Sequence, residues 1–354
     1  MNIEQYLSIF KDIPFEKSQF NEVDALVFAA IAYPKYQDFI GDKKKLNAKE
    51  MIKALSEYDA SNLIERKRRY IELLRSLCLS KRYKGVKFIN FISHHDKDSS
   101  KQFQAISLII KGNIYISFCG TDGTTIGWKE DLNMSFLEVT PSEVEALKYL
   151  RDVHNHHRTK KMIILGHSKG GRQAIYAAKN FKNKKAILGV YTFDSPNFVK
   201  EFYDNDYLKI ENKIHSYLPE ESIIGRLIAT PTHYKIVKSN NSLIMQHDTI
   251  SWEIKDTHFV YCYAFSKRST RIVNTLNSTF EKYGPDTKKE FADTLFDLLE
   301  RLSITEFSDK KNNLMLLKTA SKSIVGEWKK TPKEDRKVLI DVLFSIVKDF
   351  IRGD

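Results

Sequence analysis

The segment KMIILGHSKGGRQAIYAAKNF, residues 161–181, constrains the fold of this chain more than any other stretch. It begins with a short, continuous apolar run typical of a buried strand and continues with the apolar spacing of a helix. Ser168 lies between the two, in a stretch (residues 166–170, GHSKG) that fits the pattern G-x-S-x-G. We expect a sharp strand-to-helix turn that presents a serine nucleophile, with Gly166 and Gly170 small enough for both elements to approach. The alternative is a glycine-rich turn with a bystander serine.

The rest of the chain predicts an α/β fold with a mostly parallel central sheet flanked by helices. Strand-like runs follow residue 85 and alternate with helical segments, which is typical of a parallel sheet covered on both faces. The run FQAISLIIKGNIYISFCG reads as an antiparallel hairpin that turns at Gly112-Asn113 and forms an edge of the sheet.

Helical patterns precede and follow this core. We expect an N-terminal helical segment over residues 1–84 that packs on the core, an α/β core over 85–265, and a C-terminal helical extension over 266–354. Gly284-Pro285 is the clearest linker signal within the extension.

The composition excludes several classes of function. The 354 residues carry a formal net charge of +12, but the lysines are scattered along the chain, which argues against nucleic acid and leaves an anionic membrane surface as a possible partner. Cys78, Cys119 and Cys262 are too few and too widely spaced for a disulfide framework or a metal cluster, so we expect neither metal nor organic cofactor. The first residues are charged where a secretion signal would be apolar, so we expect a cytoplasmic protein.

A nucleophilic serine needs a histidine base, and His247 is the best placed. It follows the last strand-like run of the core, in LIMQHDTISW, where a loop can reach across to the turn at Ser168. His215 lies inside a strand-like run, His233 precedes one, and His258 lies near an aromatic segment.

The carboxylate that should orient His247 is open between three residues. The acid often follows the penultimate core strand, and the segment PEESIIG there offers Glu220 and Glu221, of which we prefer Glu221. Asp194, in YTFDSPNF, is the competitor because some hydrolases place the acid one strand earlier. Asp248 is the immediate neighbour of His247 and therefore a poor partner.

Acyl transfer also needs donors for the oxyanion, each worth about 3 kcal/mol of barrier. One should be the backbone N–H of Lys169, directly after the nucleophile. The other should come from the loop Gly120-Thr121-Asp122-Gly123, which follows an apolar strand.

These motifs together resemble known hydrolases. FCGTDGTTIGWKEDLNMSF is similar to the oxyanion loop of class 3 (fungal-type) lipases, and GHSKGGRQAIYAA is similar to their GHSLGG segment. The chain more closely resembles a bacterial lipase-like family of the α/β-hydrolase superfamily, known largely as a domain of unknown function. The further segments that carry this resemblance are NEVDALVFAAIAY, YTFDSPNF, PEESIIG and QHDTISW. The resemblance implies an α/β-hydrolase fold, Ser168 as nucleophile, His247 as base, and Thr121 with Lys169 as oxyanion-hole residues.

The resemblance has two departures. Cys119 stands where these lipases have an arginine, and PEESIIG replaces their aspartate segment.

From the motifs as a whole we expect a serine hydrolase of the lipase or esterase type that acts on a carboxylic ester. The alternatives are a catalytically inactive α/β-hydrolase-fold binding or scaffold protein and a basic peripheral membrane-binding protein.

Overall fold

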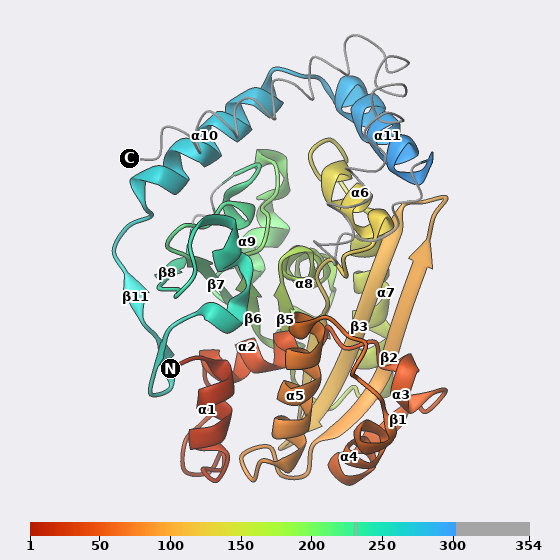
Figure 1. Cartoon of the computed structure of the whole chain (residues 1–354), viewed down its shortest axis with the longest axis vertical. Helices are drawn as coiled ribbons and strands as arrows, with labels where there is room; N and C mark the ends of the chain where they lie inside the picture. Colours follow the sequence, from red (N-terminus) through yellow and green to blue (C-terminus); the bar gives the residue numbers. More distant parts are fainter. Residues whose placement is uncertain (230, 232, 302–354) are drawn as a thin grey trace. The chain divides into compact units, whose positions relative to one another are not determined.

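The computed structural model describes residues 1–229, 231 and 233–301. A sheet of nine strands, in the order β1-β2-β3-β4-β5-β6-β7-β8-β11, organises most of this part of the chain (Figure 1). The strands are β1 (Lys45–Asn47), β2 (Lys87–Asp96), β3 (Lys101–Ile110), β4 (Asn113–Phe118), β5 (Met162–His167), β6 (Ile187–Phe193), β7 (Ile214–Pro219), β8 (Lys235–Val237) and β11 (Tyr261–Cys262). Strands β4 to β8 run parallel, whereas the pairs β1–β2, β3–β4 and β8–β11 are antiparallel. The expected α/β class with a parallel centre is confirmed, whereas the β3–β4 hairpin lies inside the sheet, between β2 and β5, and not at its edge as expected.

The described helices are α1 (Ile3–Phe10), α2 (Glu22–Ala30), α3 (Gln37–Ile40), α4 (Ala48–Glu57), α5 (Glu65–Leu79), α6 (Thr125–Asn133), α7 (Pro141–His156), α8 (Lys169–Asn180), α9 (Asn205–Glu211), α10 (Lys267–Glu281) and α11 (Pro285–Arg301). A small separate ribbon pairs β9 (Ile254–Lys255) with β10 (His258–Phe259). Residues 302–354 of the expected C-terminal extension lie outside the described residues. The three-segment division of the chain stays a prediction.

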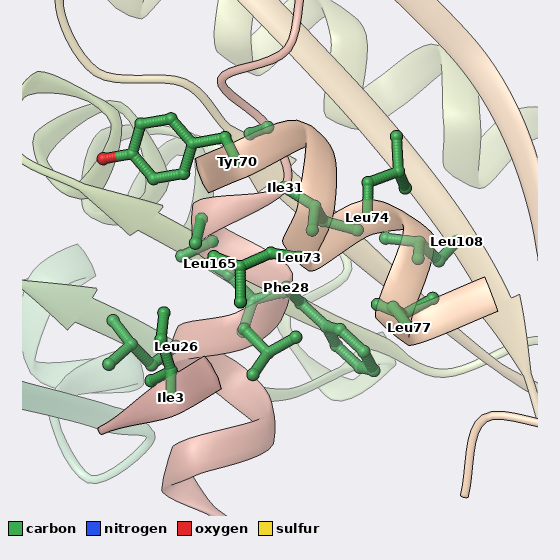
Figure 2. Packing of buried hydrophobic residues seen from close by; sticks show 14 of the residues in the cluster. Ile3, Leu26, Phe28, Ile31, Tyr70, Leu73, Leu74, Leu77, Leu108 and Leu165 are labelled. Carbon is green, nitrogen blue, oxygen red and sulfur yellow. The ribbon is translucent and has the colours of Figure 1, made fainter. Parts of the chain in front are cut away.

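The sheet buries apolar side chains on both faces because its central strands alternate between two cores. In β5, Ile163 and Leu165 join a core formed with α1, α2, α4 and α5, whereas Met162 and Ile164 join a core formed with α7 and α8. Figure 2 shows the first core, where Leu165 lies among side chains of α2 and α5. The uninterrupted apolar run of this strand is thus explained by burial on both sides.

Helix α2 is buried along its whole length and packs against β4, β5 and β6. Asn21 caps its N-terminus by accepting from the backbone N–H groups of Val23 and Asp24. Asp24 in turn forms a buried ion pair with Arg82, with Oδ2 and Nη2 2.5 Å apart. Because Arg82 also donates to three backbone carbonyls of residues 13–19, this pair fastens the N-terminal segment around α2.

The hairpin between β3 and β4 turns one residue earlier than expected. Lys111 and Gly112 form the turn, with φ of 48° and 84°, and Ile110 pairs with Asn113. Two successive left-handed residues match the twist that a two-residue hairpin requires.

The last core strand, which the sequence predicts to run up to His247, is much shorter than expected. Only Lys235–Val237 forms β8, and residues Leu243–His247 form a 3-10 turn that ends on His247. Leu243 through its backbone N–H, and Gln246 and His247 through their side chains, contact other loops in place of strand pairing.

The chain divides into two compact units, and the site described below belongs to the first, which comprises residues 1–94, 103–120 and 142–265. Within the second unit, which includes residues 95–102 and 121–141 and begins again at 266, α6 packs on α11 and Lys129 Nζ lies 2.8 Å from Asp293 Oδ1. None of the described helices is long and apolar enough to cross a membrane. Within the described residues, no three histidine, cysteine or carboxylate side chains are grouped as metal ligands.

Candidate active site

The turn at Ser168 has the backbone geometry of a presented nucleophile. Strand β5 ends at His167, α8 begins at Lys169, and Ser168 between them has φ 56° and ψ −132°. A non-glycine residue in this region is strained, and such strain is concentrated at functional sites. The strain is held in place by backbone hydrogen bonds, because Ser168 N–H donates to Phe193 O at 2.9 Å and Gly171 N–H donates to Ser168 O at 2.9 Å.

The two glycines of the G-x-S-x-G pattern are required by close packing of backbone on backbone. A Cβ on Gly166 would lie 2.1 Å from the carbonyl group of Gly170, and a Cβ on Gly170 would lie 2.2 Å from Phe118 O. Neither position has room for a methyl group, because the atoms it would meet are main-chain atoms of β4 and α8 that cannot turn aside. The pattern therefore records how closely β4, β5 and α8 approach one another beneath Ser168.

His247 lies beside this turn. Its ring centroid is 4.5 Å from that of His167, the residue directly before Ser168. His167 Nε2 also lies 2.9 Å from the backbone oxygen of His247. The loop after β8 thus brings His247 next to the turn at Ser168, and its role as base stays a prediction.

The carboxylate that contacts His247 belongs to Asp194. Asp194 Oδ2 lies 2.6 Å from His247 Nδ1, and the aspartate is 1% exposed. It directly follows β6, adopts φ 43°, and donates its N–H to Tyr217 O at 2.8 Å. The carboxylate at His247 thus follows the strand that comes directly after α8, the position at which the sequence offers Asp194 as the competitor.

The PEESIIG segment surrounds Asp194 with donors. Ser222 Oγ donates to Asp194 Oδ1 at 2.5 Å, and Gly225 N–H donates to the same oxygen at 3.1 Å. With Oδ2 on His247 and Oδ1 on these two donors, the orientation of the carboxylate is fixed.

The preferred acid, Glu221, contacts the backbone that precedes His247 and not its ring. Its Oε2 accepts from Leu243 N–H at 2.6 Å, and its own N–H donates to Gln246 Oε1 at 2.8 Å. The other candidate, Glu220, donates its N–H to Val237 O at 2.9 Å. The groups of this segment that reach Asp194 are the hydroxyl of Ser222 and the backbone N–H of Gly225.

The remaining histidine candidates lie elsewhere in the first unit. His215 stacks on Tyr191, with ring centroids 4.6 Å apart. His233 faces Glu211 at 3.4 Å and His258 faces Glu22 at 3.6 Å, both with largely exposed side chains.

The expected oxyanion donors fall in different units. Lys169 begins α8, and its side chain is buried. Gly120 approaches the nucleophile, since a Cβ built on it would lie 3.1 Å from Ser168 Cβ. Thr121 belongs to the second unit, where its Oγ1 donates to Asp131 Oδ2 at 2.5 Å. Its role in an oxyanion hole stays a prediction.

Asp122, next to Thr121, has a strongly shifted pKa. Burial works against its ionisation, but hydrogen bonds from His95 and Thr124 outweigh burial and hold its pKa well below the usual range. The charge stabilises the turn that precedes α6, which is the loop the sequence assigned to oxyanion binding.

The pKa of His167 is also shifted. Burial, reinforced by the neighbouring His247, lowers the pKa of His167 well below its ordinary value of 6.5. The ring is therefore neutral at pH 7, with one nitrogen able to donate and the other able to accept.

Comparison with known proteins agrees with the sequence resemblance. A family model described as Mbeg1-like matches residues 77–297, which is more than half of the chain. The chain belongs to the Mbeg1-like family. The Mbeg1-like match includes β2 to β8 and the Ser168, Asp194 and His247 positions, whereas α1 to α4 precede it. A search of curated proteins finds no match.

Several solved structures are similar to this Mbeg1-like chain over about two thirds of its length, all at low identity. A lipase from Rhizopus microsporus var. chinensis is 15% identical, with 62% of this chain and 73% of that chain covered and a TM-score of 0.37. Lipase II from Rhizopus niveus is 14% identical, with 67% and 87% covered and a TM-score of 0.38. The Rhizomucor miehei lipase in its propeptide complex is 15% identical, with 62% and 68% covered and a TM-score of 0.37.

The sequence does not indicate four of the contacts around His247 and Asp194. Ser222 and Gly225 lie in the PEESIIG segment, where only the glutamates have side chains typical of a triad acid, so the sequence assigns no role to the hydroxyl or the glycine. His167 is part of the G-x-S-x-G pattern but occupies one of its variable positions. Tyr33, whose Oη contacts His167 Nδ1, lies 134 residues away along the chain and carries no local signal.

Proposed function

We propose that this chain is a serine hydrolase that cleaves carboxylic esters through an acyl-enzyme on Ser168, with His247 as base and Asp194 as the acid. The observation that carries the proposal is the 2.6 Å contact between His247 Nδ1 and Asp194 Oδ2 beside a serine held at positive φ. A serine, a buried carboxylate and a histidine in this order along the chain match the triad of α/β hydrolases.

The hydrogen bonds of His247 assign its tautomer. The ionised Asp194 carboxylate can only accept, so His247 Nδ1 carries the proton and Nε2 holds the lone pair. Nε2 is then the atom able to take a proton from Ser168 Oγ. The charge on Asp194 stabilises the imidazolium that results.

The reaction that follows has two balanced halves. Ser168 Oγ forms a bond to the ester carbonyl carbon while its proton passes to His247 Nε2, and the carbonyl electrons move onto the oxygen. The C–O bond to the alcohol breaks, and His247 returns the proton to the leaving alkoxide. Water then adds to the acyl-enzyme with His247 again as base, and collapse releases the acid and restores Ser168.

The oxyanion of each tetrahedral intermediate needs donors near Ser168. We assign the backbone N–H of Lys169 as one of them, because it opens α8 directly after the nucleophile and shares the positive end of the helix dipole. The lipase resemblance assigns Thr121 as the second.

We infer that the substrate is a lipid ester. The turn that carries His247 exposes two large apolar side chains just before it, with Ile244 42% and Met245 49% exposed. Apolar groups exposed next to a catalytic base favour a substrate that presents an apolar surface.

An active-site probe tests the proposal. Wild-type protein should react with a fluorophosphonate and hydrolyse p-nitrophenyl esters, and Ser168→Ala should do neither while keeping its circular dichroism spectrum. Folded wild-type protein that resists the probe and hydrolyses no ester of any chain length would favour the non-catalytic scaffold instead.

A further inference from the structure

His167 is a buried histidine that the triad does not use. Its ring is 5% exposed and lies between two partners, Tyr33 at one nitrogen and His247 at the other. Tyr33 follows α2 and stacks on Tyr70 of α5, with ring centroids 4.8 Å apart. The three side chains connect the N-terminal helices to the loop of the base.

The contacts of His167 assign its protons. The backbone oxygen of His247 can only accept, so His167 Nε2 carries the hydrogen and donates to it at 2.9 Å. In the neutral ring Nδ1 then holds the lone pair, so Tyr33 Oη donates to Nδ1. Tyr33 therefore selects the tautomer that His167 needs in order to hold the backbone of His247.

Two contacts thus hold His247 from different sides. Asp194 orients its ring through Nδ1, and His167 holds its backbone oxygen. Other contacts hold the 3-10 turn at Leu243 and Gln246, but His167 contacts the backbone of His247 itself, so losing it lets the end of the turn that carries the ring shift. A displacement of 1 Å at a reacting group costs about 100-fold in rate.

We propose that His167 is a positioning residue for the base, with Tyr33 fixing its tautomer. This inference rests on the proposed function, because it concerns the same histidine. His167, which directly precedes the nucleophile, then holds the backbone of the base from the turn that also carries Ser168.

The decisive comparison is between two replacements of His167. His167→Gln places an amide N–H near the position of Nε2 and should retain most of kcat, whereas His167→Leu removes the donor and should lower kcat by about 100-fold with KM unchanged. Tyr33→Phe should lower kcat by about tenfold, because it leaves the ring in place but frees its tautomer. His215→Gln, a histidine stacked on Tyr191 away from the base, is the matched control and should behave as wild type.

A spectroscopic readout separates this inference from the function itself. In ¹⁵N-histidine-labelled wild type, His167 should show a protonated Nε2 and a bare Nδ1, and the Nδ1–H of His247 should give a hydrogen-bonded proton signal. That signal should shift or broaden in His167→Leu and persist in His167→Gln. These spectra test the role of His167 even if the wild type hydrolyses no ester. The absence of hydrolysis would contradict the proposed function but not the positioning role of His167.

Three results would overturn the inference. One is wild-type kcat in His167→Leu with an unchanged His247 signal, and another is an equal loss in His167→Gln and His167→Leu. The third is a protonated Nδ1 on His167. If His167→Leu does not fold, the tautomer of His167 in the wild type and the Tyr33→Phe variant test the inference instead. Full activity of Tyr33→Phe, with His167 Nδ1 still unprotonated, would show that Tyr33 does not fix the tautomer of His167.

Discussion

His247 and Asp194 stand 53 residues apart in the chain, yet His247 Nδ1 lies 2.6 Å from Asp194 Oδ2. Two loops at the same end of the parallel sheet make this contact, one after β6 and one after β8. Parallel strands bring their following loops to one edge, which is where open α/β sheets place their functional groups.

The first prediction concerns this contact. Asp194→Asn keeps the size of the side chain but removes its charge, so the correct tautomer of His247 and its imidazolium lose their support. We expect kcat to fall by about 10⁴-fold, measured as ester hydrolysis, with fluorophosphonate labelling slowed in parallel. A variant that keeps wild-type kcat would remove Asp194 from the triad.

The matched variant is Glu221→Gln. The amide oxygen can still accept from Leu243 N–H, so the turn before His247 keeps its anchor and kcat should stay within about tenfold of wild type. Should Glu221→Gln abolish hydrolysis while Asp194→Asn leaves it intact, Glu221 would be the acid.

A third prediction concerns the packing beneath Ser168. Gly166→Ala would bring a methyl group to 2.1 Å from the backbone of Gly170, so β5 and α8 would have to separate. We expect the free energy of unfolding to fall by about 3 kcal/mol, measured by urea denaturation. Gly284→Ala is the control, because a Cβ there meets nothing within 4 Å, and it should cost about 1 kcal/mol at most.

The depressed pKa of His167 predicts a pH-dependent stability. Its folded-state pKa lies well below 6.5, so the unfolded chain binds the proton more readily. The stabilisation is complete above pH 6.5 and is lost as the pH falls towards the folded-state pKa, by about 1.4 kcal/mol per pH unit. Urea denaturation at pH 7.5 and 5.5 should therefore show a steeper loss in wild type than in His167→Gln, and parallel losses would contradict the prediction.

The exposed apolar turn predicts a preference for aggregated substrates. Ile244→Ser combined with Met245→Ser should lower hydrolysis of emulsified long-chain esters and leave soluble short-chain esters unaffected, since neither side chain contributes to the triad. Equal effects on both substrates would mean that the turn acts through His247 and not through a surface.

The sequence predicts the centre of this fold better than its edges. The strand, turn and helix around Ser168 are formed by residues that are adjacent in sequence. The apolar runs and the glycines of this one segment therefore suffice to predict its structure. The strand expected up to His247 fails because hydrogen bonds to Glu221 compete with strand pairing, and such contacts depend on a loop 22 residues away.

The acid could not be chosen from sequence for a related reason. Asp194 and Glu221 both follow strands of the parallel sheet, so strand order alone admits either. What separates them is the direction in which each side chain leaves its loop. Asp194 turns towards His247 from a left-handed backbone conformation, which a residue pattern does not display.

The buried position of α2 bears on how this protein should be produced. The matched family range begins at residue 77, so a chain trimmed to it would lack α2 and Tyr33. The sheet face formed by Ile163 and Leu165 would then be open to solvent. Such a fragment should aggregate in the expression host, and its insolubility would say nothing about catalysis. The segment before the family range is therefore part of the smallest protein in which the reaction of Ser168 can be fairly measured.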